Sequence, residues 1–129
     1  MAGPVWPVSV KGVLSWDGRV VVLRNERDEW ELPGGRLEVD DASPQEALRR
    51  EFFEELAIEV QVGELLDSWI YDVAGKRVLI VTYLVTTSEP ASLTHSDEHA
   101  AVASMTPAEL EEQPIPLGYL RSIRAALAV

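Results

Sequence analysis

The sequence predicts an α+β protein in which a mixed β-sheet is flanked by helices. Two observations favour strands: apolar residues alternate with polar ones near the start of the chain, and branched runs separated by turn signals recur in its middle. A third observation favours helices, because a helix start signal stands near residue 44 and the end of the chain carries apolar residues at helical spacing. With 129 residues and 47% hydrophobic content, residues 1–129 are expected to form one domain with its own core.

The first elements form a hairpin. Residues 8–13 alternate up to the turn signal Trp-Asp-Gly-Arg at 16–19, and the branched run 20–23 follows. The segment Trp-Glu-Leu-Pro-Gly-Gly at 30–35 then breaks the pattern, because proline lacks an amide donor and paired glycines permit unusual backbone conformations. This segment indicates a functional loop.

A helix is predicted from Pro44 to about Ala57. Ser43 and Glu46 have the spacing of a capping box, and Pro44 occupies the first helical position. Its alternating pattern predicts a strand at 58–62. The remaining predicted elements are a hairpin of 68–71 and 77–86 around 74–76, a loop at 87–99, a strand at 100–105, a short helix at 107–112 and a closing helix at 117–129 with Leu120, Ile123 and Leu127 on one side.

The charge balance excludes some functions. The chain has 11 Lys and Arg residues and 22 Asp and Glu residues, which gives a formal charge of -11. A protein with this charge repels nucleic-acid polymers and anionic membrane surfaces. Divalent cations can still join carboxylates to the phosphates of a small molecule. The absence of cysteine excludes disulfides and thiolate chemistry. The first residues do not resemble a signal peptide, and no stretch has the length of a membrane span, so a cytoplasmic protein is expected.

The predicted helix concentrates carboxylates. Glu51, Glu54 and Glu55 fall within an arc of roughly 100° beside the apolar arc of the same helix. Like charges at these spacings repel, and Arg50 relieves chiefly Glu54. A bound hard cation would remove the conflict, with a carbonyl of the glycine loop as a further oxygen ligand. The alternative is a solvated acidic helix face.

The order of glycine loop, capped helix and Arg-Glu-Phe-Phe-Glu-Glu resembles the Nudix box, which would span Gly35 to Ile58. The resemblance implies the Nudix fold, an α/β/α sandwich, and one Nudix hydrolase domain over residues 1–129. It implies that Glu51, Glu54 and Glu55 bind Mg²⁺, which Mn²⁺ can replace, and that the Gly34 carbonyl is a main-chain ligand. Arg50 matches the arginine that braces the loop.

Two positions depart from the pattern. The loop is one residue longer than the box, so that either Asp41 or Ala42 stands at its first glutamate, and Asp41 is the candidate. Ala57 replaces the expected glycine, which predicts that the helix does not end in a left-handed cap, since alanine pays a steric cost for positive φ.

Other residues are candidates for catalysis or binding. Ser-Asp-Glu-His at 96–99 resembles a loop in which family members carry a general base, and this makes Glu98 a catalytic candidate beside Glu54, Arg50 and Asp41. The alternative for Glu98 is an exposed loop carboxylate, and His95 and His99 are expected to be surface or satisfied histidines. Trp30 is a candidate to stack on a base, with a core position as its alternative. Arg24 and Arg36 are candidates to bind phosphate, and the alternative for both is an ion pair with a carboxylate.

The resemblance implies magnesium-dependent hydrolysis of a diphosphate linkage in a nucleotide-like small molecule, in which water is activated near the metal and a carboxylate takes its proton. A nucleoside triphosphate pyrophosphatase is the favoured type. The alternatives are a Nudix-fold nucleotide-binding or regulatory module without turnover and a structural domain without a site. A homodimer is compatible with the resemblance, but nothing in the sequence fixes an interface.

Overall fold

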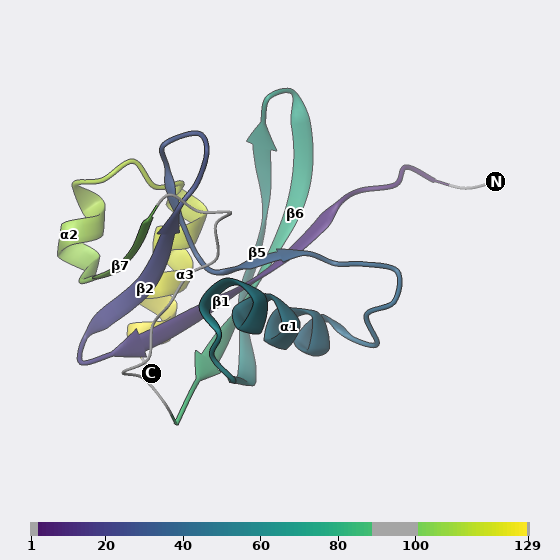
Figure 1. Cartoon of the computed structure of the whole chain (residues 1–129). Coiled ribbons are helices and arrows are strands. Elements are labelled where there is room, and N and C mark those ends of the chain that lie inside the picture. The colour runs from purple at the N-terminus through teal and green to yellow at the C-terminus, as the bar shows by residue number, and fades with distance from the viewer. Residues whose placement is uncertain (1–2, 89–100, 129) are drawn as a thin grey trace.

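The strands of the protein form one mixed sheet in the computed structural model, which describes residues 3–88 and 101–128. Sheet order is β3-β2-β1-β6-β5, with β4 also paired to β1 and β7 to β2. Figure 1 shows β7 beside β2. The β1–β6 pair is parallel and the others are antiparallel. The elements in chain order are β1 (Val8–Trp16), β2 (Arg19–Arg24), β3 (Trp30–Glu31), β4 (Gly34–Arg36), α1 (Pro44–Leu56), β5 (Gln61–Val73), β6 (Lys76–Thr86), β7 (Ala101–Met105), α2 (Pro107–Glu111) and α3 (Leu117–Leu127).

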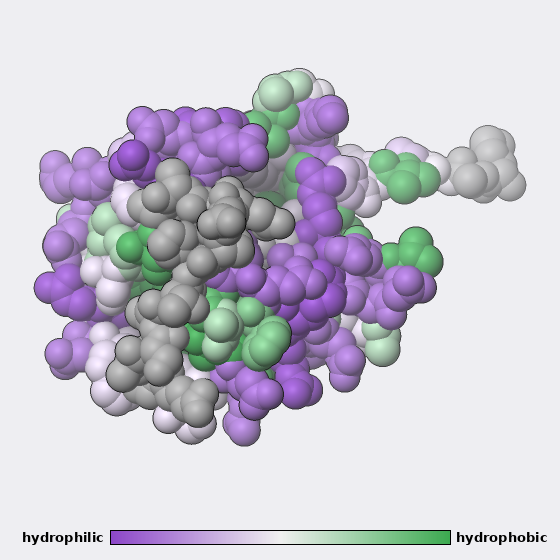
Figure 2. Space-filling model, viewed as in Figure 1, coloured by the Kyte–Doolittle hydropathy of each residue, from purple (hydrophilic) through white to green (hydrophobic). Residues whose placement is uncertain are grey.

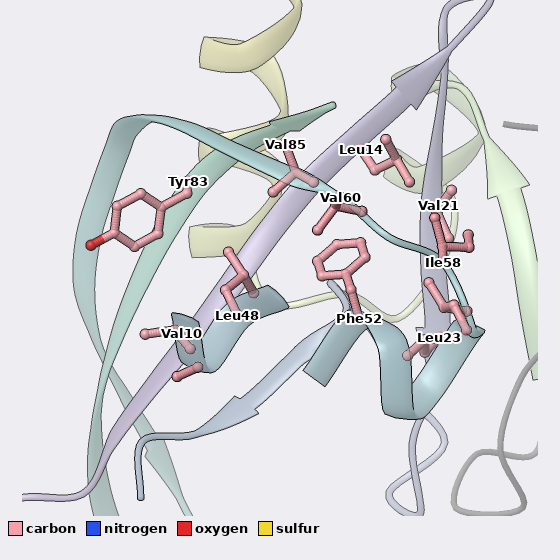
Figure 3. Packing of buried hydrophobic residues seen from close by; sticks show 12 residues of the cluster. Val10, Leu14, Val21, Leu23, Leu48, Phe52, Ile58, Val60, Tyr83 and Val85 are labelled. Atoms are coloured by element: carbon pink, nitrogen blue, oxygen red, sulfur yellow. The ribbon is translucent and has the colours of Figure 1, made fainter. Parts of the chain in front are cut away.

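One face of the sheet packs against α1. Leu48 and Phe52 of this helix are fully buried against Val10 and Leu14 of β1 and their neighbours (Figure 3). Close packing explains why glycine stands at position 12, between these two strand residues: an added Cβ would lie 2.7 Å from the Phe52 ring. The predicted helix thus reaches the sheet through the apolar arc that its spacing defines.

The other face packs against α3. Tyr119, Leu120 and Ile123 of this helix are buried with Val13 of β1 and Ile80 of β6. Alternation along β1 therefore sends its residues to two different cores, as expected for a sheet covered on both faces. The prediction of a mixed sheet with flanking helices is confirmed.

Both predicted hairpins are confirmed. Asp17 and Gly18 join β1 to β2 with φ of 55° and 76°, and Ala74 and Gly75 join β5 to β6 with φ of 51° and 75°. Two central residues with positive φ match the twist of the strands that they connect.

The predicted strand at 58–62 is only partly right. β5 begins at Gln61 and continues to Val73, so it also contains the predicted segment 68–71. Ile58 and Val60 are 1% and 5% exposed but lie in the connection between α1 and β5. The alternation of apolar residues at 58–60 therefore reflects burial in the core and not pairing in a strand. Of the predicted loop 87–99, residues 89–99 lie outside the described residues.

Helix α1 begins as predicted. The Ser43 hydroxyl accepts a hydrogen bond from the Glu46 amide at 3.1 Å, and Pro44 is the first helical residue. The expectation for its end is wrong: Ala57 has φ 56° and ψ 35°, a left-handed cap whose N–H donates to the Phe53 carbonyl at 2.9 Å. The hydrogen bond and the burial of Ile58 directly after it hold alanine in a conformation that glycine adopts without steric cost.

Ala57→Gly is therefore expected to raise the free energy of unfolding by about 0.5–1 kcal/mol, because it removes the steric cost of positive φ. Chemical denaturation measures the change. Ala42→Gly is the control, since exposed Ala42 is not among the residues with positive φ. Equal effects of the two substitutions would contradict this account of the cap.

No helix in the described part of the chain is long and apolar enough to cross a membrane. Hydrophilic side chains cover much of the face that carries α1 (Figure 2), in keeping with the formal charge of -11.

Candidate active site

Strand β4 brings the glycine segment between β1 and α1. Gly34 lies opposite Lys11 in the β1–β4 ladder, and Gly35 lies opposite Val10. The Gly34 φ is 139°, and a Cβ at this position would overlap the Val10 carbonyl oxygen. This conformation and this close backbone approach both require glycine.

Glu55 ties α1 to the glycine segment. Its side chain is buried, with 3% of the residue exposed, and its Oε1 accepts a hydrogen bond from the Gly34 amide at 2.8 Å. A hydrogen bond to a carboxylate is strong where water is excluded. The contact fixes the helix carboxylate and the Gly34 backbone relative to each other.

Glu51 lies one helical turn earlier, against Gly35. An added Cβ at Gly35 would lie only 2.5–2.6 Å from the Glu51 carboxylate, so the absence of a side chain leaves the space that this carboxylate fills. Burial raises the pKa of Glu51 above its ordinary value, while Arg50 opposes that shift. Glu51 is thus held at the glycine segment in a partly dehydrated position.

Arg50 joins the loop before α1 to the glutamates of the helix. Its Nε and Nη2 donate to both carboxylate oxygens of Asp41, at 3.1 and 3.0 Å. Its Nη1 lies 3.1–3.3 Å from carboxylate oxygens of Glu38, Glu51 and Glu54. The hydrogen bonds from Arg50 hold the pKa of Asp41 below its usual range. Asp41 therefore reaches the bracing arginine although its loop is one residue longer than the box.

These residues border a cavity of about 600 Å³. Gly34, Arg36, Glu51 and Glu55 line one part of it. The sheet and the loop after β2 supply much of the rest, including Ser9, Lys11, Asn25, Arg27, Glu31 and Tyr71. Carboxylates thus meet a backbone glycine segment and cationic side chains at one concave surface, the combination that a charged phosphate compound needs.

Lys11 is a cavity residue that the sequence reasoning missed as a site residue. It is 6% exposed, and its Nζ lies 3.8 Å from Glu31 Oε1. Burial by itself would lower the pKa of Lys11, but Tyr119, Glu31, Glu55 and Glu51 together keep it above its ordinary value. The available signal was the period-two spacing of Lys11 with Ser9 and Val13, which places the lysine on one face of a predicted strand.

Arg24 and Trp30 lie away from this cavity lining. Trp30 is 6% exposed, belongs to the core under α3, and donates its indole N–H to Gln113 Oε1 at 3.3 Å. Arg24 pairs with Asp28 at 3.1 Å and stacks over the Trp30 ring at 5.8 Å. The core and ion-pair alternatives account for both residues, whereas Arg36 does line the cavity. Glu98, with His95 and His99, lies outside the described residues.

The donor set fits a hard divalent cation. Glu51, Glu55 and the Gly34 carbonyl offer oxygen atoms, which Mg²⁺ and Mn²⁺ prefer. Glu54 is more exposed, with 55% of its side chain accessible, and is paired with Arg50. Within residues 3–88 and 101–128, no three His, Cys, Asp or Glu side chains already form a metal-binding group. Because Arg50 forms ion pairs with Glu51 and Glu54, an ion would compete with Arg50 for the oxygens of these two glutamates.

Known proteins resemble this chain along most of its length. The family model described as NUDIX domain matches residues 6–125. A MutT-like protein of Streptomyces ambofaciens is 34% identical over 124 residues, which cover 95% of this chain and 78% of that protein. The CTP pyrophosphohydrolase of Escherichia coli K12 is 29% identical over 125 residues, 93% of this chain and 90% of that protein. The solution structure of the E. coli ORF135 protein superimposes with a TM-score of 0.77 at 28% identity, covering 98% of this chain and 94% of that one.

Proposed function

The chain belongs to the NUDIX family and is a hydrolase of nucleotide-like substrates, and from this premise we propose that it cleaves a diphosphate linkage with Mg²⁺ or Mn²⁺ held by Glu51, Glu55 and the Gly34 carbonyl. Glu54 is proposed as a further ligand. The observation that carries the proposal is the junction of Glu55, the Gly34 backbone and Glu51 at the wall of the cavity.

The bound cation would neutralise phosphate charge and activate water. The residues of the chain position the reaction: Glu55 fixes Gly34, Gly35 admits the Glu51 carboxylate, and Arg50 holds Asp41 and the loop in place. Arg36, on the cavity wall, is proposed to contact phosphate. Such prearranged charges lower the barrier because they need little reorganisation during the reaction.

Glu98 is proposed as the general base that takes the proton from the attacking water, on the strength of the Ser-Asp-Glu-His sequence at 96–99. Glu98→Gln is expected to lower kcat by roughly 10²- to 10⁴-fold, with metal affinity nearly unchanged. Steady-state kinetics and metal titration measure the two effects, with Asp97→Asn as the neighbouring control. A loss below threefold would remove Glu98 from the mechanism.

A nucleoside triphosphate pyrophosphatase is the favoured type. The relative named CTP pyrophosphohydrolase matches this chain along nearly its whole length and supports that choice. The rival proposal is a nucleotide-binding or regulatory module without turnover. The mutually repelling glutamates of α1 argue against it, because binding alone gains little from them.

The test is a panel of nucleoside triphosphates, ADP-ribose, UDP-glucose and dinucleoside polyphosphates incubated with magnesium or with chelator. Phosphorus NMR of the products identifies the bond that is cut. Release of a nucleoside monophosphate only with metal is the expected result. Tight binding of a panel member without turnover would support the regulatory module, and neither binding nor turnover would support a domain without a site.

A further inference from the structure

The lining of the cavity contains an ion pair that the proposed cleavage chemistry does not use. Lys11 and Glu31 both line the cavity, and their side chains are only 8% and 13% exposed. Lys11 lies opposite Gly34 in the β1–β4 ladder, so the pair adjoins the glutamate site. A group contacted here would belong to the same bound substrate as the diphosphate.

Stability gives little reason for this pair. Moving both charges out of water costs more than their mutual attraction usually returns, and apolar residues of similar size commonly do as well. The same face of β1 carries the apolar residue Val13 in the core under α3. The pair is therefore better explained by contact with a ligand bound in the cavity.

Glu31 is held in a fixed orientation. Its Oε2 accepts a hydrogen bond from Asn25 Nδ2 at 3.1 Å. Asn25 is itself fixed, because its Oδ1 accepts from the backbone amides of Arg27 and Glu29 at 2.9 and 3.1 Å. An acceptor prearranged in this way binds a ligand without an ordering cost.

The spacing of the pair selects the chemistry of its ligand. Lys11 Nζ and Glu31 Oε1 are 3.8 Å apart, longer than a hydrogen bond, and an oxygen between them can lie about 2.8 Å from each. The ammonium only donates and the carboxylate only accepts. A hydroxyl does both, whereas a phosphate oxygen only accepts and is repelled by Glu31.

We propose that Lys11 and Glu31 form a specificity site that binds a sugar hydroxyl of the substrate. The inference rests on the proposed function, since it assigns a polyhydroxylated group to the compound whose diphosphate is cut. The hydroxyl belongs either to the ribose of the nucleoside or to a second sugar beyond the diphosphate, and both sources share the same recognition chemistry.

The experiment compares kcat/KM for parent compounds and their single-deoxy forms. One arm uses CTP with 2′-deoxy-CTP and 3′-deoxy-CTP, and the other uses UDP-glucose with its single-deoxy sugars. Wild type is expected to favour a parent over one deoxy form by roughly 10- to 100-fold, the value of a hydrogen bond to a charged group. The arm that shows the preference identifies the sugar.

Lys11→Met and Glu31→Gln are expected to bring the ratio of kcat/KM for the parent to kcat/KM for the deoxy form close to one. The double variant Lys11→Met/Glu31→Gln leaves neither charge unpaired and keeps the test valid if a single variant unfolds. Lys76→Met, at the exposed second lysine, and Glu64→Gln, at an exposed glutamate of β5, are the controls.

Three results would overturn the inference: equal activity of wild type on parent and deoxy forms, equal losses on both in the variants, or no activity of wild type on CTP and UDP-glucose while another panel compound is cut. Absence of cleavage across the whole nucleotide panel would instead contradict the proposed function.

Discussion

Replacing Glu51 or Glu55 by glutamine is expected to lower kcat/KM for the cleaved substrate by roughly 10²- to 10³-fold. Each change removes a negative charge from the proposed cation site but keeps the shape of the side chain. In Glu55→Gln the amide carbonyl oxygen of the new side chain can still accept a hydrogen bond from the Gly34 amide, so the contact at 2.8 Å need not be lost. Activity should therefore fall much further than stability.

Steady-state kinetics with near-saturating magnesium, together with thermal unfolding, separates these effects. Glu64→Gln is the matched control because Glu64 is exposed on β5. Turnover within threefold of wild type in either site variant would exclude that glutamate from the metal site.

Gly34→Ala is expected to lower the free energy of unfolding by about 3 kcal/mol. The new Cβ would overlap the Val10 carbonyl oxygen of β1, and φ at this position is 139°. The backbone has to move, because neither the new Cβ nor the Val10 carbonyl oxygen belongs to a flexible side chain. Chemical denaturation of the two proteins measures the difference.

Two glycines serve as controls for this prediction. Gly18 has φ 76° but open space around its Cβ position, so Gly18→Ala reports the cost of positive φ alone, about 1 kcal/mol. At Gly35 the Cβ would meet the Glu51 carboxylate, so Gly35→Ala should reduce activity more than stability. A Gly34→Ala effect no larger than that of Gly18→Ala would contradict the close-approach account.

Local signals account for what the sequence predicted well. Ser43 and Pro44 define the start of α1 through hydrogen bonding and a fixed φ, and Asp17-Gly18 defines a hairpin through positive φ. These effects act within a few residues. The spacing of Glu51 and Glu55 also follows from helix geometry alone, which is why their shared helix face could be recognised.

Long-range contacts account for what the sequence did not predict. Lys11 lines the cavity because β4 pairs beside its strand and the loop after β2 lies at the same cavity, contacts between distant parts of the chain. For Trp30 the sequence allows both base stacking and a core position, and the hydrogen bond that its buried indole makes to Gln113 joins residues 83 positions apart. The local steric cost of alanine does not predict the left-handed conformation of Ala57, because the burial of Ile58 beside it depends on the tertiary fold.

The central claim is that Glu51 and Glu55 hold a divalent cation beside Gly34, and thermal unfolding with magnesium tests it without knowledge of the substrate. Magnesium at tenfold excess over its Kd is expected to stabilise wild type by about 1.4 kcal/mol, roughly a 5 °C rise in Tm. The rise should be much smaller for Glu51→Gln and unchanged for Glu64→Gln. Wild type that shows no rise at millimolar magnesium, or Glu51→Gln that shows an equal one, would contradict the metal site and favour a solvated acidic helix face.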